Sequence, residues 1–209
     1  MERTITRIAR DLNLRSQATH LPHLVFVTDE RRSPDPKKYI SQLPPGSGVL
    51  FRHYNYHKRN ELALSLRSIC DDLSLTLIIA DDLQLAIDVK ADGLHLPEYR
   101  LKSPSKVVFK WRRTNNVFLT AAAHSSRTTL KALRLNLDAV FLSPIFQSSS
   151  HPEVRPLGLM RFMKICTTVN IPIYALGGIN DISAKKLTGC GAVGIAAIGA
   201  LIGPVENKG

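Results

Sequence analysis

The sequence predicts an α/β protein, a single-domain (β/α)8 barrel of the TIM type. Eight short apolar runs recur along the 209 residues, and amphipathic stretches of helical period separate several of them. No early run is followed by the GxGxxG turn of an open dinucleotide-binding sheet. Because the length is near the lower limit for a barrel, we expect short loops and no second domain. A doubly wound open sheet is the alternative.

The expected strands are rich in Val, Ile, Leu or Phe, and their nearly continuous apolar character is typical of parallel strands covered by helices. They lie at 24–27, 48–51, 75–79, 93–96, 117–119, 139–142, 171–175 and 193–197. Two one-sided apolar stripes indicate helices, and we interpret both as core packing. The stripes are Leu62, Leu66, Ile69 and Leu73, and Leu159, Phe162, Cys166 and Val169. Residues 1–20 are expected to form a helical extension ahead of the barrel.

Composition narrows the classes of function. The 28 Lys and Arg residues exceed the 17 acidic residues and give a formal net charge of +11, which favours an anionic partner. An aromatic content of 6% and the lack of a nucleic-acid-reading motif argue against DNA or RNA as that partner. The three cysteines form no CxxC pair, which disfavours a disulfide scaffold or a thiolate zinc site. No apolar run reaches the roughly 18 residues of a membrane span, so we expect a soluble cytoplasmic protein.

Two turns form the first candidate site. Gly177 and Gly178 directly follow the seventh expected strand, and Ile198 and Gly199 follow the eighth. Glycine lets the backbone approach an anion closely, and free amides at the N-terminus of the next helix hold phosphate without a charged side chain. Barrels of this class commonly bind phosphate after strands seven and eight. The sequence therefore predicts a phosphate site, with a tight turn that binds nothing as the alternative.

His124 is the candidate acid/base. It follows the fifth expected strand, after the small residues 121–123 that leave space for a ligand. Imidazole is the side chain whose pKa suits proton transfer near neutrality. The alternative is a histidine that is hydrogen-bonded at the start of a helix capped by Ser125 or Ser126.

Adjacent carboxylates and a basic residue follow two other strands. Asp81 and Asp82 come after the third expected strand, where carboxylate oxygens suit Mg²⁺ bound to a diphosphate. Capping of the helix that begins near Leu83 is the commoner role for such acids. Arg52 ends the second expected strand and would point toward the barrel mouth, where it is a candidate for substrate binding.

A polar loop follows the sixth expected strand and contains the remaining candidates. Ser148, Ser150 and His151 lie in it, and their side chains are suited to donate hydrogen bonds to phosphate oxygens. A solvated loop without a ligand has the same composition. The loop lies on the face where the strands of a barrel end, which favours substrate binding.

Five segments carry a resemblance to a known family. They read VFVTD at 25–29, LIIADD at 77–82, ADGLHL at 91–96, SPIF at 143–146 and IPIYALGGI at 171–179. In this order they resemble the thiamine phosphate synthase family, which includes the TenI-type thiazole tautomerases, from about residue 24 to residue 202. The resemblance implies a barrel whose turns at Gly177, Gly178, Ile198 and Gly199 bind the phosphate of a thiazole phosphate.

The synthase branch of that family also implies a metal. There, Mg²⁺ helps pyrophosphate leave an aminopyrimidine-methyl diphosphate, and Asp81 corresponds to one metal-binding aspartate. The second such aspartate falls at Arg100, and a cation cannot ligate Mg²⁺. Where the family has a basic residue just after Arg52, this chain has Tyr54. Where the family has a lysine in the sixth loop, this chain has His151. The resemblance thus implies a Mg²⁺ cofactor, while these departures argue against a complete site for it.

Most departures fall on the diphosphate and metal half of the site. We therefore expect a thiamine-biosynthesis enzyme that acts on thiazole phosphate with an impaired Mg-diphosphate half-site. One alternative is a thiazole tautomerase that uses His124 as acid/base, because moving a double bond in the ring needs no departing pyrophosphate. Another is a barrel that binds a phosphate ligand without catalysis. A synthase would take the pyrimidine diphosphate as second substrate, with Arg52, Arg100 or His151 neutralising it. The oligomeric state, a homo-oligomer included, is left open.

Overall fold

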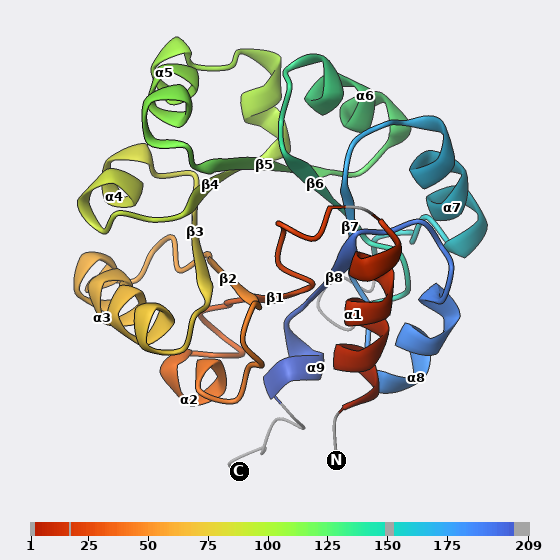
Figure 1. The fold of residues 1–209 in the computed structure, drawn as a ribbon, viewed down its shortest axis with the longest axis horizontal. Coiled ribbons are helices and arrows are strands. Elements are labelled where there is room, and N and C mark those ends of the chain that lie inside the picture. Colours follow the sequence, from red (N-terminus) through yellow and green to blue (C-terminus); the bar gives the residue numbers. More distant parts are fainter. Residues whose placement is uncertain (1–2, 17, 149–152, 203–209) are drawn as a thin grey trace.

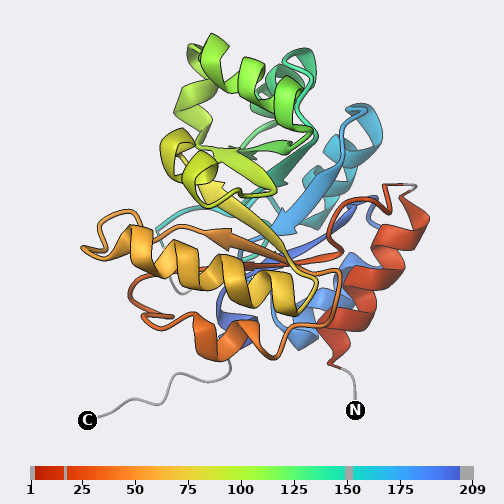
Figure 2. The ribbon, with the colours of Figure 1, turned by 60° about the vertical axis from the view of Figure 1, so that its left-hand side comes forward.

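Eight parallel strands close into a barrel in chain order, with β1 paired to both β2 and β8 (Figure 1). The computed structural model describes residues 3–16, 18–148 and 153–202. The predicted (β/α)8 barrel is confirmed, and the open-sheet alternative is excluded by the pairing of β1 with β8. Figure 2 shows the same ring from the side, with helices flanking the strands on the outside.

The strands lie close to the expected ranges. They are β1 Leu24–Val27, β2 Gly48–Phe51, β3 Thr76–Ala80, β4 Gly93–Leu96, β5 Phe118–Ala123, β6 Ala139–Leu142, β7 Ile173–Leu176 and β8 Gly194–Ala197. The helices of the described residues are α1 Thr4–Arg15, α2 Lys37–Ile40, α3 Arg59–Asp72, α4 Leu83–Asp88, η1 Glu98–Lys102, α5 Lys106–Asn115, α6 Ser126–Arg134, α7 Leu159–Thr168, α8 Asp181–Ala184, η2 Lys185–Leu187 and α9 Gly199–Ile202. In the described part of the chain, no helix combines the length and the apolar character needed to cross a membrane.

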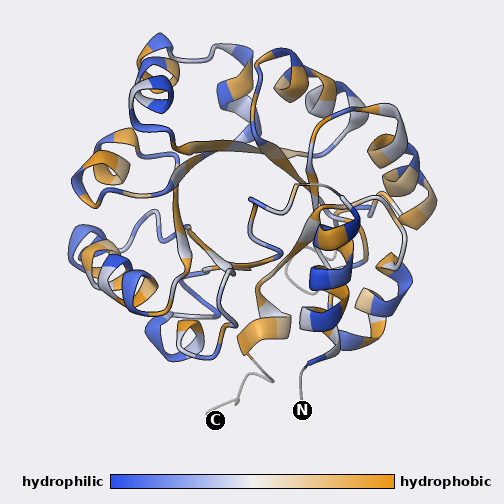
Figure 3. Cartoon of the chain, in the orientation of Figure 1, coloured by the Kyte–Doolittle hydropathy of each residue, from blue (hydrophilic) through white to orange (hydrophobic). Residues whose placement is uncertain are grey.

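Alternation along each strand divides the core into two clusters. Val25 and Val27 face the inside of the ring, whereas Leu24 and Phe26 pack outward among the helices. This follows from the period of two in a strand, and burial of both faces explains the continuous apolar runs of the sequence. Figure 3 shows the consequence: the ring is mainly hydrophobic, and the hydrophilic residues lie on the helices and loops.

The segment that follows α1 closes one end of the barrel (Figure 1). The amide of Asn13 donates to the carbonyl oxygens of Ala18, Leu21 and Val193. Gly194 lets this segment come close, because a Cβ there would lie 2.3 Å from the carbonyl oxygen of His23. These contacts are made where β8 begins, so the amino-terminal end of the barrel is filled and the opposite end is left for a ligand.

Candidate functional site

Two adjoining cavities open where the strands end. The glycine cavity, of about 370 Å³, lies at the ends of β7 and β8. The central cavity, of about 520 Å³, lies over the mouth of the barrel and contains Arg52, His95 and His124. Leu176 lines both cavities. A ligand with an anionic tail and a ring therefore has room to occupy both at once.

The turn after β7 needs glycine at two successive positions. Gly177 has a φ of +97° and Gly178 a φ of +66°, a region that side chains disfavour. A Cβ on Gly178 would lie 2.4 Å from the carbonyl oxygen of Gln147, and one on Gly177 would lie 2.7 Å from the Cα of Pro144. The glycines thus allow the loop after β6 to pack on this turn, and they also leave its backbone bare toward the cavity. Both interpretations of the Gly-Gly pair, turn and cradle, apply to this geometry.

Two of the amides expected to be free at the next helix are already paired. Asn180 caps α8, and its Oδ1 accepts hydrogen bonds from the amides of Ile182 and Ser183. Ser183 returns the interaction by accepting from the amide of Asn180 and donating to the carbonyl oxygen of Gly178. The capping box thus occupies the amides of Ile182 and Ser183, which the expected phosphate site would have used. The groups that remain at the cavity are the turn itself and the Ile198–Gly199 backbone.

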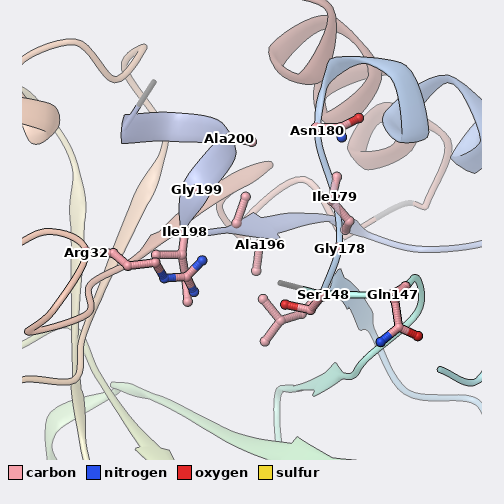
Figure 4. A pocket seen from close by; sticks show the side chains of 13 residues that line it. Arg32, Gln147, Ser148, Gly178, Ile179, Asn180, Ala196, Ile198, Gly199 and Ala200 are labelled. Atoms are coloured by element: carbon pink, nitrogen blue, oxygen red, sulfur yellow. The ribbon is translucent and has the colours of Figure 1, made fainter. Parts of the chain in front are cut away.

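Arg32 adds a positive charge that the sequence interpretation missed. It comes from the loop after β1, lines the glycine cavity and extends toward Ile198 in Figure 4. Its Nε lies 4.0 Å from Oδ1 of Asp29, and its side chain is 27% exposed. Ser148 lines the same cavity and belongs to the loop after β6. A guanidinium, a hydroxyl and two stretches of glycine-containing backbone are a donor set that suits a phosphate.

His124 is oriented by the neighbouring strand. Its Nδ1 lies 2.7 Å from the carbonyl oxygen of Ser143, which can only accept, so Nδ1 carries the proton of the neutral ring. Its Nε2 is then the basic nitrogen, and it lies 3.7 Å from Oε2 of Glu98. The other carboxylate oxygen of Glu98 accepts from the hydroxyl of Thr128. The arrangement has the geometry of a general acid/base with a fixed tautomer and a carboxylate beside its basic nitrogen.

Ser125 caps the next helix, as the alternative interpretation of His124 expected. The Ser125 side chain accepts from the amide of Thr128 at the start of α6. The ring of His124, however, is held by the carbonyl oxygen of Ser143 after β6. Its side chain is 55% exposed and lines the central cavity.

His95 is a second histidine of the central cavity, and it stays neutral. Its Nδ1 lies 3.0 Å from the hydroxyl oxygen of Thr120, and its ring stands edge-on to Phe141. Burial, with a smaller contribution from the charge of Arg52, lowers the pKa of His95 to about 3. Arg52 itself lines the same cavity, as the sequence interpretation expected of a substrate-binding residue.

Asp81 lines neither of these cavities. It lines a separate cavity of about 190 Å³ together with Arg100. Its Oδ1 accepts from Nε of Arg100 at 2.8 Å, and its Oδ2 accepts from the hydroxyl of Tyr99. Asp82 has the capping role expected for one of the two acids, because its side chain accepts from the amide of Leu85 at the start of α4.

This donor set does not fit Mg²⁺. Among residues 3–16, 18–148 and 153–202, no group of three or more His, Cys, Asp or Glu side chains is arranged to hold a metal ion. Magnesium takes carboxylate oxygens and keeps several waters, but both oxygens of the candidate Asp81 are already paired. The candidate metal ligand is thus not brought together with a second one.

The sequence interpretation reached some of these residues and missed others. Gly177, Gly178, Ile198, Gly199 and Ser148 share the glycine cavity, and Arg52 shares the central cavity with His124. Ser150 and His151 lie outside the described residues. Arg32, Glu98, Tyr99 and Lys102 were not proposed, yet all four line one of the two cavities. The only available signal was their position after the first and fourth strands, where polar residues of a barrel face the ligand.

Comparison with known proteins assigns the chain to a family. A family model described as thiamine monophosphate synthase matches residues 24–201. A protein of Aquifex aeolicus named "Putative thiamine-phosphate synthase 2" is 40% identical over 139 residues, which are 66% of this chain and 72% of that one. A thiamine-phosphate synthase of Clostridium tetani is 30% identical and is covered over 90% of its length by 89% of this chain. The solved thiamine phosphate pyrophosphorylase of Pyrococcus furiosus superimposes with a TM-score of 0.72 at 26% identity, over 86% of this chain and 87% of that one.

Proposed function

Because the chain belongs to the thiamine monophosphate synthase family of thiamine biosynthesis, we propose that it binds a thiazole phosphate and moves a proton on the ring with His124. The observation that carries this proposal is the junction of the two cavities at Leu176. A phosphate in the glycine cavity would place the attached ring in the central cavity, where Nε2 of His124 is available. The reaction would be a thiazole tautomerisation that proceeds without a bound metal.

In the glycine cavity, the phosphate would be bound by backbone groups of two turns and by the guanidinium of Arg32. The turn at Gly177 and Gly178, the backbone at Ile198 and Gly199, and the guanidinium of Arg32 surround it. Backbone amides fix the position of the phosphate, and Arg32 balances part of its charge. The substrate is thus held by a part of the molecule that takes no part in the proton transfer.

His124 would then act through Nε2 alone. The carbonyl oxygen of Ser143 holds the proton on Nδ1, so Nε2 takes a proton from one ring position of the substrate and returns it at another. The double bond shifts, and the substrate keeps its composition. Glu98, which lies 3.7 Å from Nε2, would stabilise the imidazolium while it carries the proton. A positioned acid/base of this kind contributes about 10²- to 10⁴-fold to a rate.

A second candidate is the synthase reaction itself. The names of the relatives favour it, and Arg52 and Lys102 give the central cavity positive charge suited to a diphosphate. Because both oxygens of Asp81 are paired and do not provide a complete Mg²⁺ site, the positive charge of these two residues would have to replace the metal in that reaction. A cytoplasmic location stays a prediction from the sequence, and the oligomeric state, a homo-oligomer included, stays open.

One assay separates the two candidates. The purified protein is given the less stable tautomer of thiazole carboxylate phosphate, with EDTA, and the ring signals are followed by NMR. Isomerisation that needs His124 and tolerates EDTA is the expected result. In parallel, the protein is given thiazole phosphate and the pyrimidine diphosphate, with and without Mg²⁺. Formation of thiamine phosphate without any isomerisation would replace the proposal by the synthase reaction.

A further inference from the structure

We infer that Arg100 takes the place of a divalent cation beside Asp81, so that this protein keeps a fixed positive charge there and binds no metal. The inference deepens the metal-free part of the proposed function, but its test measures metal binding by the free protein and not turnover. It starts from the disagreement between the Mg²⁺ that the family resemblance implies and the contacts of the residues that would have to bind it.

Each oxygen of the Asp81 carboxylate already accepts a hydrogen bond from a side chain of η1. The Nε of Arg100 lies 2.8 Å from Oδ1, and the hydroxyl of Tyr99 donates to Oδ2. The guanidinium also lies over the ring of Tyr99, 5.3 Å from the ring centre. The three side chains therefore brace one another, and each oxygen that a metal would need has a donor.

The charge balance supports the same conclusion. A guanidinium is always protonated, and Nε of Arg100 lies 2.8 Å from Oδ1 of Asp81. An incoming dication would have to displace this cation and would meet its repulsion at short range. Arg100 thus places a positive charge beside Asp81 where a metal ion would otherwise do so, and it does not need the additional oxygen ligands that a metal ion needs.

The acids around this position are occupied elsewhere. Asp82 caps α4 and is paired with Arg59. Glu98 accepts from Thr128 and faces His124. Since hard cations need several oxygen ligands at once, neither carboxylate is available to complete a site with Asp81.

The position of Arg100 in the sequence suggests a substitution that tests the inference. It stands where the family resemblance places a second metal-binding aspartate. Arg100→Asp should therefore create a pair of carboxylates facing each other. In the Asp81–Arg100 ion pair, 53% of the Arg100 side chain and 18% of the Asp81 side chain are accessible, so the residue that is changed is the partner that faces solvent. The substitution should leave the fold intact.

Metal binding is measured directly with Mn²⁺, whose free aquo ion gives an electron paramagnetic resonance signal that binding suppresses. The wild-type protein should leave the signal unchanged at millimolar Mn²⁺, and Arg100→Asp should suppress it with at least about tenfold higher affinity, equivalent to ~1.4 kcal/mol. Arg127→Asp makes the same change of charge on exposed α6 and should behave as the wild type. Stoichiometric Mn²⁺ binding by the wild type that Asp81→Asn abolishes would overturn the inference.

Circular dichroism shows whether Arg100→Asp folds, and a second variant is used in case it does not. Arg100→Gln frees the Asp81 carboxylate without adding a ligand, and it should gain no Mn²⁺ affinity because one carboxylate is insufficient. The wild-type titration and its Asp81→Asn control still decide the inference in that case, because neither requires Arg100→Asp to fold. The melting temperature of the wild type should also be the same with EDTA and with millimolar Mg²⁺.

Discussion

The Nδ1 atom of His124 lies 2.7 Å from the carbonyl oxygen of Ser143, and the two residues follow the adjacent strands β5 and β6. The amide of Ser143 in turn donates to the carbonyl oxygen of Ala123. The barrel pairing is thus continued past the ends of both strands and holds the imidazole in one tautomer. The orientation of the proposed acid/base is therefore set by strand register rather than by a flexible loop.

His124→Ala should lower the rate of isomerisation by about 10²- to 10⁴-fold, because the group that carries the proton is removed. The affinity for thiazole phosphate should stay within about threefold, since the phosphate is held in the other cavity. Single-turnover kinetics and titration calorimetry measure the two quantities. His57→Ala, which removes an exposed histidine outside both cavities, is the control and should change neither. An unchanged rate in His124→Ala would remove the residue from the mechanism.

Arg32→Ala should weaken binding of thiazole phosphate by about tenfold or more, because a hydrogen bond to a charged group contributes roughly 1.5–3 kcal/mol. The neighbouring Arg31 is exposed and lines neither cavity. Arg31→Ala therefore removes the same net charge from the same loop and should change affinity little. Titration calorimetry at physiological salt compares the two variants. Equal losses for both would mean that only the overall positive field matters.

Gly178→Ala should destabilise the fold, whereas Gly199→Ala should not. At Gly178 a methyl group would lie 2.4 Å from the carbonyl oxygen of Gln147 at a φ of +66°, and strained backbone of this kind costs about 1–3 kcal/mol before the clash is added. At Gly199 the nearest atom is Nη1 of Arg32 at an ordinary 3.6 Å. Urea unfolding measures both, and similar stability of the two variants would contradict the packing described for the turn.

Gly199→Ala also provides a test of the cradle that is separate from stability. Its methyl group would enter the glycine cavity without disturbing the fold, so binding of thiazole phosphate should weaken while the urea midpoint stays unchanged. Titration calorimetry gives the affinity. Unaltered affinity would place the phosphate away from the Ile198–Gly199 backbone.

His95 should make the protein less stable as the pH falls. Burial lowers its pKa from 6.5 to about 3 in the folded state, so between these values the unfolded chain binds a proton that the folded protein does not. The free energy of unfolding should then decrease by about 1.4 kcal/mol per pH unit from this residue alone. Burial also lowers the pKa of His53, which adds a loss of the same sign.

His95→Gln should flatten this dependence, and urea midpoints between pH 7 and pH 4.5 measure it. The exposed His57→Gln is the matched control and should keep the slope of the wild type. Identical slopes for the wild type and His95→Gln would mean that His95 is protonated as readily in the folded protein as in the unfolded chain.

The strands were predictable because each is buried on both faces. Four of the expected ranges, 24–27, 48–51, 93–96 and 139–142, coincide with β1, β2, β4 and β6. The fifth was expected at 117–119, but β5 continues through three alanines to Ala123. Alanine has little strand preference of its own, and these residues are extended because β4 and β6 pair with them. The seventh strand was expected to begin at residue 171 and begins at Ile173, just after Pro172, which cannot donate to a ladder.

The candidate site was predictable only as far as strand ends reveal it. The glycine turns and His124 follow strands directly, so their positions could be read from the strand count. Arg32 reaches the glycine cavity because closure of the barrel brings β1 beside β8, a relationship between distant segments that no local pattern carries. The pairing of Asp81 with Arg100 likewise depends on the left-handed φ of +52° at Asp81 and on the turn of η1.

The central claim is that the phosphate of a thiazole phosphate lies between two backbone turns while its ring faces His124. A crystal structure of the protein soaked with thiazole phosphate tests this most directly. Phosphate density bounded by Gly178, Gly199 and Arg32, with the ring extending past Leu176 toward Nε2 of His124, is the predicted result. Phosphate density beside Arg52 or Lys102 in the central cavity, with the glycine cavity empty, would contradict it.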